Sequence, residues 1–467
     1  MSTALPLAWL LPLAAGTAAW LALVPARGPG WRAAALGHGM LFGLLLAAGA
    51  TALFARADTQ HALAHAAPWL ALFAIVMGVV ARRRSQQPPL PHATKHSQKV
   101  NKWIIVLLSL ALASLAWRGW IALREILLRP TFPWDAWDAW AVKSKTWFLL
   151  GHYAPFVSMR DWLAQPAADL FTGPAWSYPA PLGWMQVWFA SAAGGWIEPL
   201  VNLPWFALWL GLLLGHYGQW RALGLSRVRA AVFVYLLGSL PLIAVHVALA
   251  GYADLWIATA FGFAVLAWMR WLERRECGQL AIAVACALLL PMLKLEGAVW
   301  LLLFACVAVL SLLSRRARRY TVLFIVAITA ITIALGKFTL PLPGLGWVHI
   351  GATAIDIPMI ARLAIGWHGA AFKGVLYSLF AQPNWHLLWW LAPLLVVWRR
   401  GELRVHESLR LLGLLLLLGW GFLLFLFLFT DAARWAESFT AINRLVMHIV
   451  PATITLLALL CRNVKTP

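Results

Sequence analysis

Two aspartates and two lysines lie close together in the segment PWDAWDAWAVKSK, residues 133 to 145. Asp135 and Asp138 are three residues apart, so they would share one face of a helical turn, with Lys143 and Lys145 one or two turns further along. The alternative is an interfacial tryptophan belt with solvated charges, for which the three tryptophans of the segment are suited. We favour a functional site, because charged groups at membrane depth are costly and usually functional.

Two further segments place charged residues beside a glycine between apolar runs. In HVALAGYADLW, Tyr252 and Asp254 follow a glycine that permits a tight turn, and capping of the next helix is an equally good role for the aspartate. In MLKLEGAVW, Lys294 and Glu296 interrupt two apolar runs. These two residues can simply pair with each other, but a lysine at the edge of a cavity can also bind a phosphate, and we favour that function.

A fourth segment, AESFTAINRLVMHIVPA, leads into the last apolar run. Arg444 and His448 stand four residues apart on one helical face. An arginine that enters a membrane needs an anionic partner, and a lipid-linked phosphate would serve, whereas an ordinary buried histidine is the favoured interpretation of His448. The other histidines and the four cysteines have no metal-ligand spacing, so we expect no metal site and no cofactor, while dependence on a divalent metal stays open.

The composition decides which elements must position these residues. The chain is 63% hydrophobic and 11% charged, far from the balance of a soluble domain. Its apolar runs approach the length of about 20 residues that a helix needs to cross a bilayer, and they are too evenly apolar for alternating barrel strands. The sequence therefore predicts an all-α polytopic membrane protein.

Thirteen membrane spans are expected from the apolar runs and the charged loops between them. They lie near residues 4–24, 34–54, 62–81, 103–126, 199–220, 228–249, 254–271, 279–293, 297–314, 321–340, 384–398, 411–430 and 445–461. The segment 183–197 is also apolar, but counting it as a span would move several arginines to the outer side. We interpret it as a re-entrant or interfacial helix whose backbone is buried by protein.

Orientation follows from the lysines and arginines, because cytoplasmic loops retain them. With these spans, 24 of the 37 Lys and Arg residues fall on one side, which is therefore the cytoplasmic side. The net charge of +21 reflects this topology signal and not nucleic-acid binding. We expect a bacterial inner-membrane protein with a periplasmic N-terminus and a cytoplasmic C-terminus, in which 12 of the 16 acidic residues lie at or beyond the outer half of the membrane.

Three regions follow from this map. Residues 1–81 form a three-helix N-terminal region, and residues 82–102 form a cytoplasmic linker. Residues 103–461 form the main membrane region, with a periplasmic loop at 129–181 that carries short helices. A second outer polar segment, 341–383, contains several glycines and histidines.

In the order and placement of these motifs, the sequence resembles the GT-C superfamily of membrane glycosyltransferases, over about residues 103–461. WDAWDAW occupies the place of the acidic motif in the first outer loop of that superfamily, and GYAD is similar to a second outer acidic motif, with YPAPLGW between them. No WWDYG-type motif and no large C-terminal soluble domain is present in the sequence. The protein mannosyltransferase and aminoarabinose transferase branches are therefore closer than the oligosaccharyltransferases.

The resemblance implies an inverting transfer of a sugar from a polyprenyl-phosphate carrier to an envelope glycan or lipid on the periplasmic face. Asp135 would be the general base on the acceptor hydroxyl, with Asp138 as its alternative. Lys294, Arg444 and Lys143 would bind the donor phosphate. The residues expected to contact the substrate are Asp254, Glu296, Tyr252, Tyr178, Trp137 and His448.

Two other classes of function remain. A transporter or flippase for a lipid-linked sugar would line a path across the membrane with charges. The charges inside the expected spans gather instead at the outer half, as a one-sided active site requires. A non-catalytic subunit of an envelope polysaccharide complex would tolerate Asp135→Asn.

Overall fold

The computed structural model describes residues 4–25, 27–85, 101–165, 169–314, 316–321, 323–324, 327, 336–342, 346–358 and 361–462. The chain forms two compact units. Unit 1 comprises residues 1–297 and 450–467, and unit 2 comprises residues 298–449. The expected linker 82–102 lies mostly outside the described residues, as does most of the expected span 321–340.

Unit 1 contains twelve described helices and a π-helical turn, followed along the chain by the second half of α20. These elements are α1 (Ala4–Leu23), α2 (Trp31–Phe54), α3 (Ala62–Arg84), α4 (Lys102–Leu128), η1 (Ala136–Trp140), α5 (Ala141–Leu150), α6 (Met159–Ala164), α7 (Pro181–Ala193), α8 (Glu198–Ala222), α9 (Arg227–Gly238), α10 (Pro241–Ala248), α11 (Asp254–Arg274) and α12 (Cys277–Leu293).

Unit 2 begins just inside α13 and ends within α20, and it contains both helices and a small sheet. Its elements are α13 (Gly297–Leu312), β1 (Lys337–Leu342), β2 (Gly346–Gly351), β3 (Ala354–Ile357), β4 (Ala361–Ala364), α15 (Gly369–Leu376), η2 (Tyr377–Ala381), η3 (Pro383–Trp385), α16 (Leu388–Trp398), α17 (Arg400–Val405), α18 (Glu407–Phe429), α19 (Ala433–Glu437) and α20 (Ile442–Leu460).

Eight of the described helices are long and apolar enough to cross a membrane, namely α1, α2, α3, α4, α8, α11, α18 and α20, and the bent pair α9 and α10 would make a ninth. By length and composition the chain is a multi-pass, mainly helical membrane protein. The thirteen predicted spans are too many among the described residues. Three of them correspond to α12, α13 and α16, which have 17, 16 and 11 residues, and a fourth falls on undescribed residues.

The predicted span 228–249 is broken. Helices α9 and α10 meet at an angle of 62°, because Pro241 begins α10 and cannot continue the backbone hydrogen bonds of α9. The break leaves the carbonyl of Ser239 available, and the guanidinium of Arg118 in α4 donates to it at 2.9 Å. Arg118, which lies inside the predicted span 103–126, therefore stabilises the break between α9 and α10.

Helix α11 is the centre of unit 1. Its residues from Asp254 to Trp271 are all buried, and it packs against α8, α10 and α12. A helix that is apolar all round belongs in the interior of a bundle. Close helix contacts depend on small residues, since Gly37 of α2 lies against Gly211 and Gly215 of α8 with no room for a side chain.

The three N-terminal helices belong to unit 1 together with residues 101–297. Helix α2 packs against α1, α3, α7 and α8, and α1 contacts α12. The helices on both sides of the predicted linker 82–102 therefore belong to one compact unit. Helix α7, in the segment predicted to be re-entrant, has 13 residues and is almost entirely surrounded by protein.

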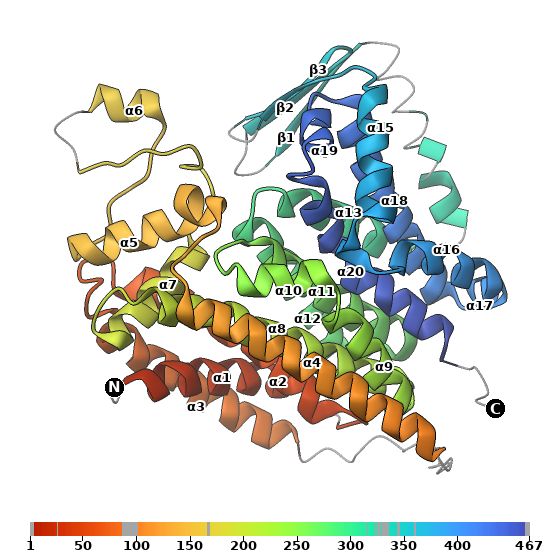
Figure 1. Ribbon diagram of the computed structural model, residues 1–467, viewed down its shortest axis with the longest axis horizontal. Helices are drawn as coiled ribbons and strands as arrows, with labels where there is room; N and C mark the ends of the chain where they lie inside the picture. Colours follow the sequence, from red (N-terminus) through yellow and green to blue (C-terminus); the bar gives the residue numbers. More distant parts are fainter. Residues whose placement is uncertain are drawn as a thin grey trace. The chain divides into compact units, whose positions relative to one another are not determined.

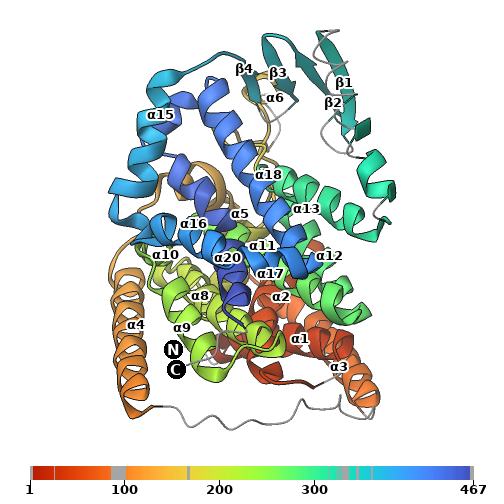
Figure 2. The same ribbon diagram turned by 90° about the vertical axis from the view of Figure 1, so that its right-hand side faces the viewer.

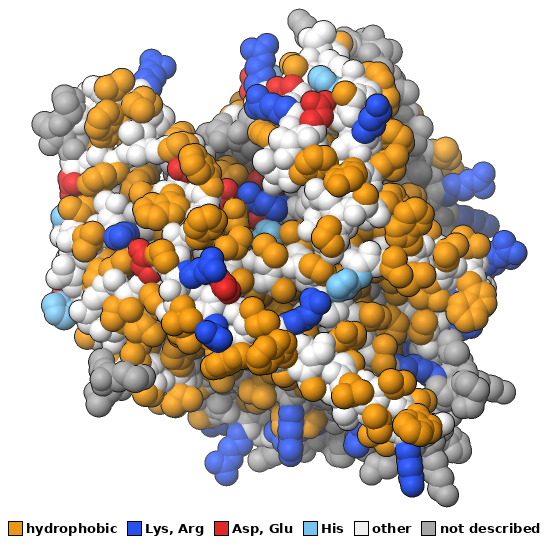
Figure 3. Space-filling model, in the orientation of Figure 1, with side chains coloured by type: hydrophobic (Ala, Val, Ile, Leu, Met, Phe, Trp, Pro, Cys, Tyr) orange, Lys and Arg blue, Asp and Glu red, His pale blue; other side chains and the backbone are white. Residues whose placement is uncertain are grey.

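Helix α4 lies at the edge of unit 1 beside α8, α9 and α10 (Figures 1 and 2). Few of its side chains are buried, and large apolar ones such as Trp103, Leu107 and Trp117 are exposed. Hydrophobic side chains cover much of the surface over α4, and Lys and Arg side chains lie along the lower edge of the view as well as in its middle (Figure 3). The exposed apolar side chains of α4 fit a lipid-facing helix.

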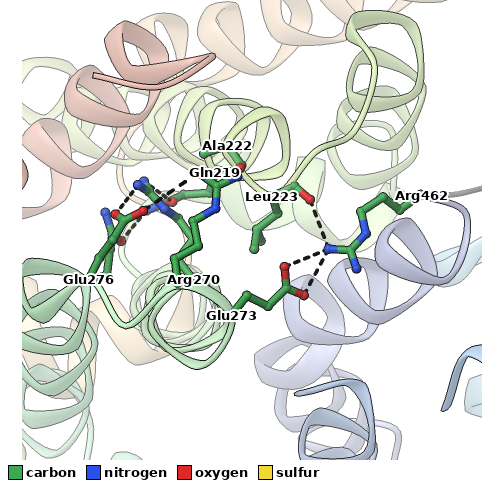
Figure 4. A network of polar contacts seen from close by, with 9 residues as sticks. Gln219, Ala222, Leu223, Arg270, Glu273, Glu276 and Arg462 are labelled. Atoms are coloured by element: carbon green, nitrogen blue, oxygen red, sulfur yellow. Dashed lines mark hydrogen bonds and ion pairs between the residues drawn. The ribbon is translucent and has the colours of Figure 1, made fainter. Parts of the chain in front are cut away.

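A network of polar contacts joins four chain segments at one end of unit 1 (Figure 4). Arg270 at the end of α11 pairs with Glu276 before α12 and donates to Gln219 of α8. Arg462, after α20, pairs with Glu273 at 2.8 Å and also donates to the carbonyl of Leu223. The ends of α8, α11 and α20, which sequence analysis placed on the cytoplasmic side, are thus adjacent to the start of α12.

The strands of unit 2 were not predicted. Four strands form an antiparallel sheet in the order β1-β2-β3-β4. Strands β2 to β4 lie within the second outer polar segment, whereas β1 begins inside the expected span 321–340. His349 of β2 lies opposite Thr339 of β1 and Asp356 of β3, and Asp356 lies opposite Arg362 of β4. The alternation along these strands is too short and too rich in Pro and Gly to stand out from a polar loop.

Candidate functional site

Lys294 lies at a break between two helices. Helix α12 ends at Leu293, and Lys294 is extended, with φ −157° and ψ 146°. Helix α13 restarts at Gly297, where a Cβ would overlap the carbonyl oxygen of Leu290. The glycine permits the chain to restart close to the end of α12, so that Lys294 and Glu296 both project from the short break.

Asp254 meets Lys294 from the neighbouring helix. It occupies the first turn of α11, where unpaired backbone N–H groups and the helix dipole favour a negative charge. Its Oδ1 accepts from the ammonium of Lys294 at 2.9 Å, and both side chains are buried. Helices α11 and α12 are therefore joined by ion pairs at both ends, Asp254 to Lys294 at one and Arg270 to Glu276 at the other.

Glu296 and Tyr178 complete this group, which we call the Lys294 cluster: Asp254, Lys294, Glu296 and Tyr178. Oε1 of Glu296 lies 3.3 Å from the Lys294 ammonium and accepts from the hydroxyl of Tyr178 at 3.3 Å. Burial raises the pKa of Tyr178, and the charges of Glu296, Asp135 and Asp254 raise it further, so the phenol stays a donor. Four predicted site residues are thus in contact.

Lys143 fixes the loop that carries Tyr178. Its ammonium donates to the carbonyl oxygens of Trp176 at 2.9 Å and Tyr178 at 2.7 Å. Burial lowers the pKa of Lys143 to about 8, because the charged form loses hydration. Lys143 therefore contributes by holding the loop, and two of its three donors are committed to backbone carbonyls.

The segment with the two aspartates forms a π-helical turn. Asp135 directly precedes η1 and Asp138 lies within it, and the N–H of Ala141 donates to the carbonyl of Ala136. A π turn holds more residues than an α turn, so residues three apart do not stack as the sequence analysis assumed. Both aspartates are partly exposed, and the electrostatic effect on Tyr178 shows that Asp135 is near the Lys294 cluster. Single π turns occur frequently at functional sites.

The two acidic segments are packed against each other through Gly251. This glycine has φ +124°, and a Cβ here would lie 2.5 Å from the Cβ of Ala136 in η1. The adjacent Tyr252 is held by its backbone, since its carbonyl accepts from the indole of Trp205 at 2.7 Å. Trp137 donates to the carbonyl of Thr131 and remains 55% exposed, so its ring is available to a ligand or to lipid.

Two predicted site residues lie in unit 2, in the first half of α20. Arg444 is partly exposed. His448 is fully buried, and its Nδ1 accepts from the indole of Trp300 at 2.9 Å. The favoured interpretation of His448 as a buried, hydrogen-bonded histidine agrees with this contact. Beside them, Asn443 bonds to Trp385 and Gln382.

Sequence analysis missed a chain of polar residues behind the π turn. The carboxylate of Glu198 accepts from the N–H of Thr131 at 2.6 Å and lies 3.5 Å from Lys145. The chain continues from Thr131 through side chains on α8, α7 and α5, namely Asn202, Gln186 and Ser144. Single amides within apolar segments were the signal for these residues, because such groups need buried partners.

Comparisons with known proteins identify no relative of this chain. No family model, curated protein or solved structure matches the chain. Among the described residues, no group of three or more His, Cys, Asp or Glu side chains is arranged to hold a metal ion. The functional argument therefore depends on the Lys294 cluster and the π turn.

Proposed function

We propose that the chain is a membrane glycosyltransferase that moves a sugar from a polyprenyl-phosphate carrier to a hydroxyl of an envelope glycan or lipid on the periplasmic face. The observation that supports it is the Lys294 cluster, which gathers three acidic or phenolic groups and an ammonium from α11, the α12–α13 break and the loop before α7. Asp135 lies close enough to affect Tyr178. Such a concentration of ionisable groups at the ends of apolar helices is costly unless it has a function.

The reaction needs few catalytic groups. The acceptor oxygen forms a bond to the anomeric carbon, the bond from that carbon to the phosphate oxygen breaks, and the lipid phosphate leaves with the electron pair. The proton of the acceptor hydroxyl passes to a carboxylate, for which Asp135 and Asp138 are the candidates from sequence. Since phosphate is a good leaving group, the protein mainly positions the reactants and stabilises charge.

The cations have different roles in this proposal. Lys294 is held between two carboxylates, so its positive charge reaches a phosphate only in competition with Asp254 and Glu296. Arg444, a partly exposed guanidinium in the first turn of α20, belongs to unit 2 and stays a candidate for the donor phosphate from sequence alone. Lys143 acts through the loop that it fixes.

Helix α11, at the centre of unit 1, favours an enzyme over a transporter. Between Asp254 and Arg270, helix α11 has no charged residue over a length of about 24 Å. Its single hydroxyl in the middle, that of Thr259, donates back to the carbonyl of Leu255. A path for a charged sugar phosphate would require polar groups along this distance.

The test combines purified protein in lipid with polyprenyl phosphates that carry tritiated hexoses or pentoses, and with envelope glycans and lipids as acceptors. Transfer of label by the parent protein and a reduced rate in Asp135→Asn or Asp138→Asn are expected. An Asp169→Asn variant is the control, because this outer-loop carboxylate is exposed and pairs with His152. Absence of transfer from every donor would refute the assignment.

A further inference from the structure

The two oxygens of the Glu296 carboxylate have unequal surroundings. Oε1 is close to two donors, the ammonium of Lys294 and the hydroxyl of Tyr178, each at 3.3 Å. Oε2 is buried and has no hydrogen-bond partner among the described residues, although the side chain as a whole is 29% exposed. A buried carboxylate oxygen without a donor is costly and requires an explanation.

Glu198 provides a comparison, because it is a carboxylate of the same unit with a structural role. Its Oε2 accepts from the backbone of Thr131 and its Oε1 faces Lys145, so both oxygens have protein partners. Asp254, the other acid beside Lys294, is fully buried at the start of α11. Of the two acids that pair with Lys294, only Glu296 has a side chain that is partly exposed.

We infer that Oε2 of Glu296 binds the acceptor hydroxyl and takes its proton as the general base. This inference rests on the proposed glycosyl transfer and assigns to Glu296 the role that sequence analysis gave to Asp135. The O–H bond of the acceptor breaks, the proton goes to Oε2, the new glycosidic bond forms, and the lipid phosphate leaves with the electrons of the broken bond.

The neighbours of Glu296 suit this role. Lys294 and Tyr178 orient the carboxylate through Oε1, and Oε2 keeps its acceptor capacity, in the arrangement of a base with its orienting groups. Asp254 holds Lys294 in place from behind. Asp135 belongs to the surroundings of Tyr178 and is assigned a positioning role.

Steady-state transfer from the tritiated polyprenyl-phosphate sugars tests the inference in Glu296→Gln, Glu296→Asp, Asp135→Asn and the Asp169→Asn control. Glu296→Gln is expected to lower kcat by about 100-fold or more, the usual contribution of a general base, with little change in the KM for the donor. Glu296→Asp is expected to retain part of the activity. The limb of the pH profile on which kcat/KM rises with pH is expected to disappear in Glu296→Gln and to persist in Asp135→Asn.

The outcomes separate the two proposals. A parent protein that transfers no sugar refutes the proposed function itself. A parent protein that is active, with a Glu296→Gln variant as active as Asp169→Asn, overturns the inference while the proposed function stands. An active Glu296→Gln variant beside an inactive Asp135→Asn variant returns the role of the base to Asp135.

Thermal unfolding provides a readout that needs no substrate. If Oε2 is reserved for a ligand, Glu296→Gln removes a buried carboxylate oxygen that has no donor and leaves the Asp254–Lys294 pair intact, so the Tm of the ligand-free protein is expected to stay within about 2 °C of the parent or to rise. Glu198→Gln removes a carboxylate with two protein partners and is expected to lower the Tm. A drop in Glu296→Gln as large as that in Glu198→Gln would show that Glu296 is structural and overturn the inference.

Discussion

Lys294 shows how much of a residue's behaviour depends on partners from other parts of the chain. Its ammonium is buried between Asp254, 40 residues earlier, and Glu296, two residues later. A buried lysine with one partner removed leaves a charge without compensation, whereas replacement of a whole ion pair by apolar groups is often tolerated. The pairing of Lys294 with Glu296 was predictable from their proximity, but the contact with Asp254 requires α11 and α12 to be antiparallel neighbours.

Asp254→Asn is expected to lower the free energy of unfolding by about 3 kcal/mol, because it weakens the compensation of a buried ammonium. In the double variant Asp254→Asn with Lys294→Met, part of this loss is expected to return, and Glu296 keeps its bond from Tyr178. Unfolding in detergent followed by tryptophan fluorescence provides the measurement. Strict additivity of the two single changes would contradict a direct interaction.

The burial of Lys143 is expected to make the stability of the protein depend on pH. Its pKa is about 8 in the folded chain and about 10.5 in the unfolded chain. Below pH 8 both states hold the proton, while between pH 8 and 10.5 only the unfolded state does, so the contribution of Lys143 to stability increases as the pH rises through this window. The neutral amine still donates two hydrogen bonds to the carbonyls of Trp176 and Tyr178.

The measurement for Lys143 is the Tm of the parent minus that of Lys143→Met at pH 7.5 and at pH 10. We expect this difference to be larger at pH 10, because other titrating groups act on both proteins alike. A difference that stays constant or falls would show that the ammonium in the folded chain is as well solvated as in the unfolded chain.

At the scale of elements, the positions of the candidate site residues are set by turns and helix breaks. The long helices contribute less to these positions. The two acidic segments meet because Gly251 lets the turn after α10 lie directly on Ala136 of the π turn. The direction of α10 depends in turn on the break at Pro241, where Arg118 satisfies the freed carbonyl of Ser239. The motifs WDAWDAW and GYAD were predicted as candidate sites from residue types alone, but their contact could not be predicted in this way.

Gly251→Ala is expected to destabilise unit 1 and to separate the two acidic segments. Alanine rarely adopts φ +124°, and its Cβ would lie 2.5 Å from that of Ala136. Gly194→Ala is the matched control, since Gly194 has φ +73° with nothing within 4 Å of a Cβ, and it should cost only the roughly 1–2 kcal/mol of the left-handed conformation. Thermal unfolding compares the two, and equal losses would refute the packing of the turn on Ala136.

At the scale of the whole molecule, hydropathy predicted the class of protein but overestimated the number of spans. Eight of the thirteen expected spans are full-length helices, because a window of apolar residues finds any helix that is long and uninterrupted. It does not separate these from short apolar helices such as α12 and α16, or from a span broken at a proline. The four-stranded sheet of unit 2 was missed because its strands have only four to six residues, with a proline in β1 and glycines at the ends of β2.

Only part of the candidate site could be predicted from the sequence. Charged residues in apolar surroundings identified Asp254, Lys294 and Glu296, because such groups are rare without a reason. The unequal environment of the two Glu296 oxygens could not be predicted, since it depends on Tyr178, which lies 118 residues away. The bonds from Lys143 to the loop of Tyr178 were also beyond the sequence, because a lysine near two aspartates more readily suggests an ion pair.

The predicted orientation, with the Lys294 cluster on the periplasmic side, can be tested with cysteines. Cys277 is exposed at the start of α12, beside the polar network of Figure 4, and should face the cytoplasm. In a protein whose other cysteines are replaced, a membrane-impermeant maleimide is expected to label Cys277 only after the cells are permeabilised. A second protein, without native cysteines but with Asp169→Cys in the outer loop, should be labelled in intact cells.

The two labels report on opposite ends of the same unit, since α11 and α12 are antiparallel and the Asp254–Lys294 pair lies at the end far from Arg270 and Glu276. Labelling of Cys277 in intact cells together with protection of Asp169→Cys would place the Lys294 cluster in the cytoplasm. A sugar donor and acceptor on the periplasmic face would then have no access to Glu296, and the proposed function would fail on topology alone, whatever the activity of the variants.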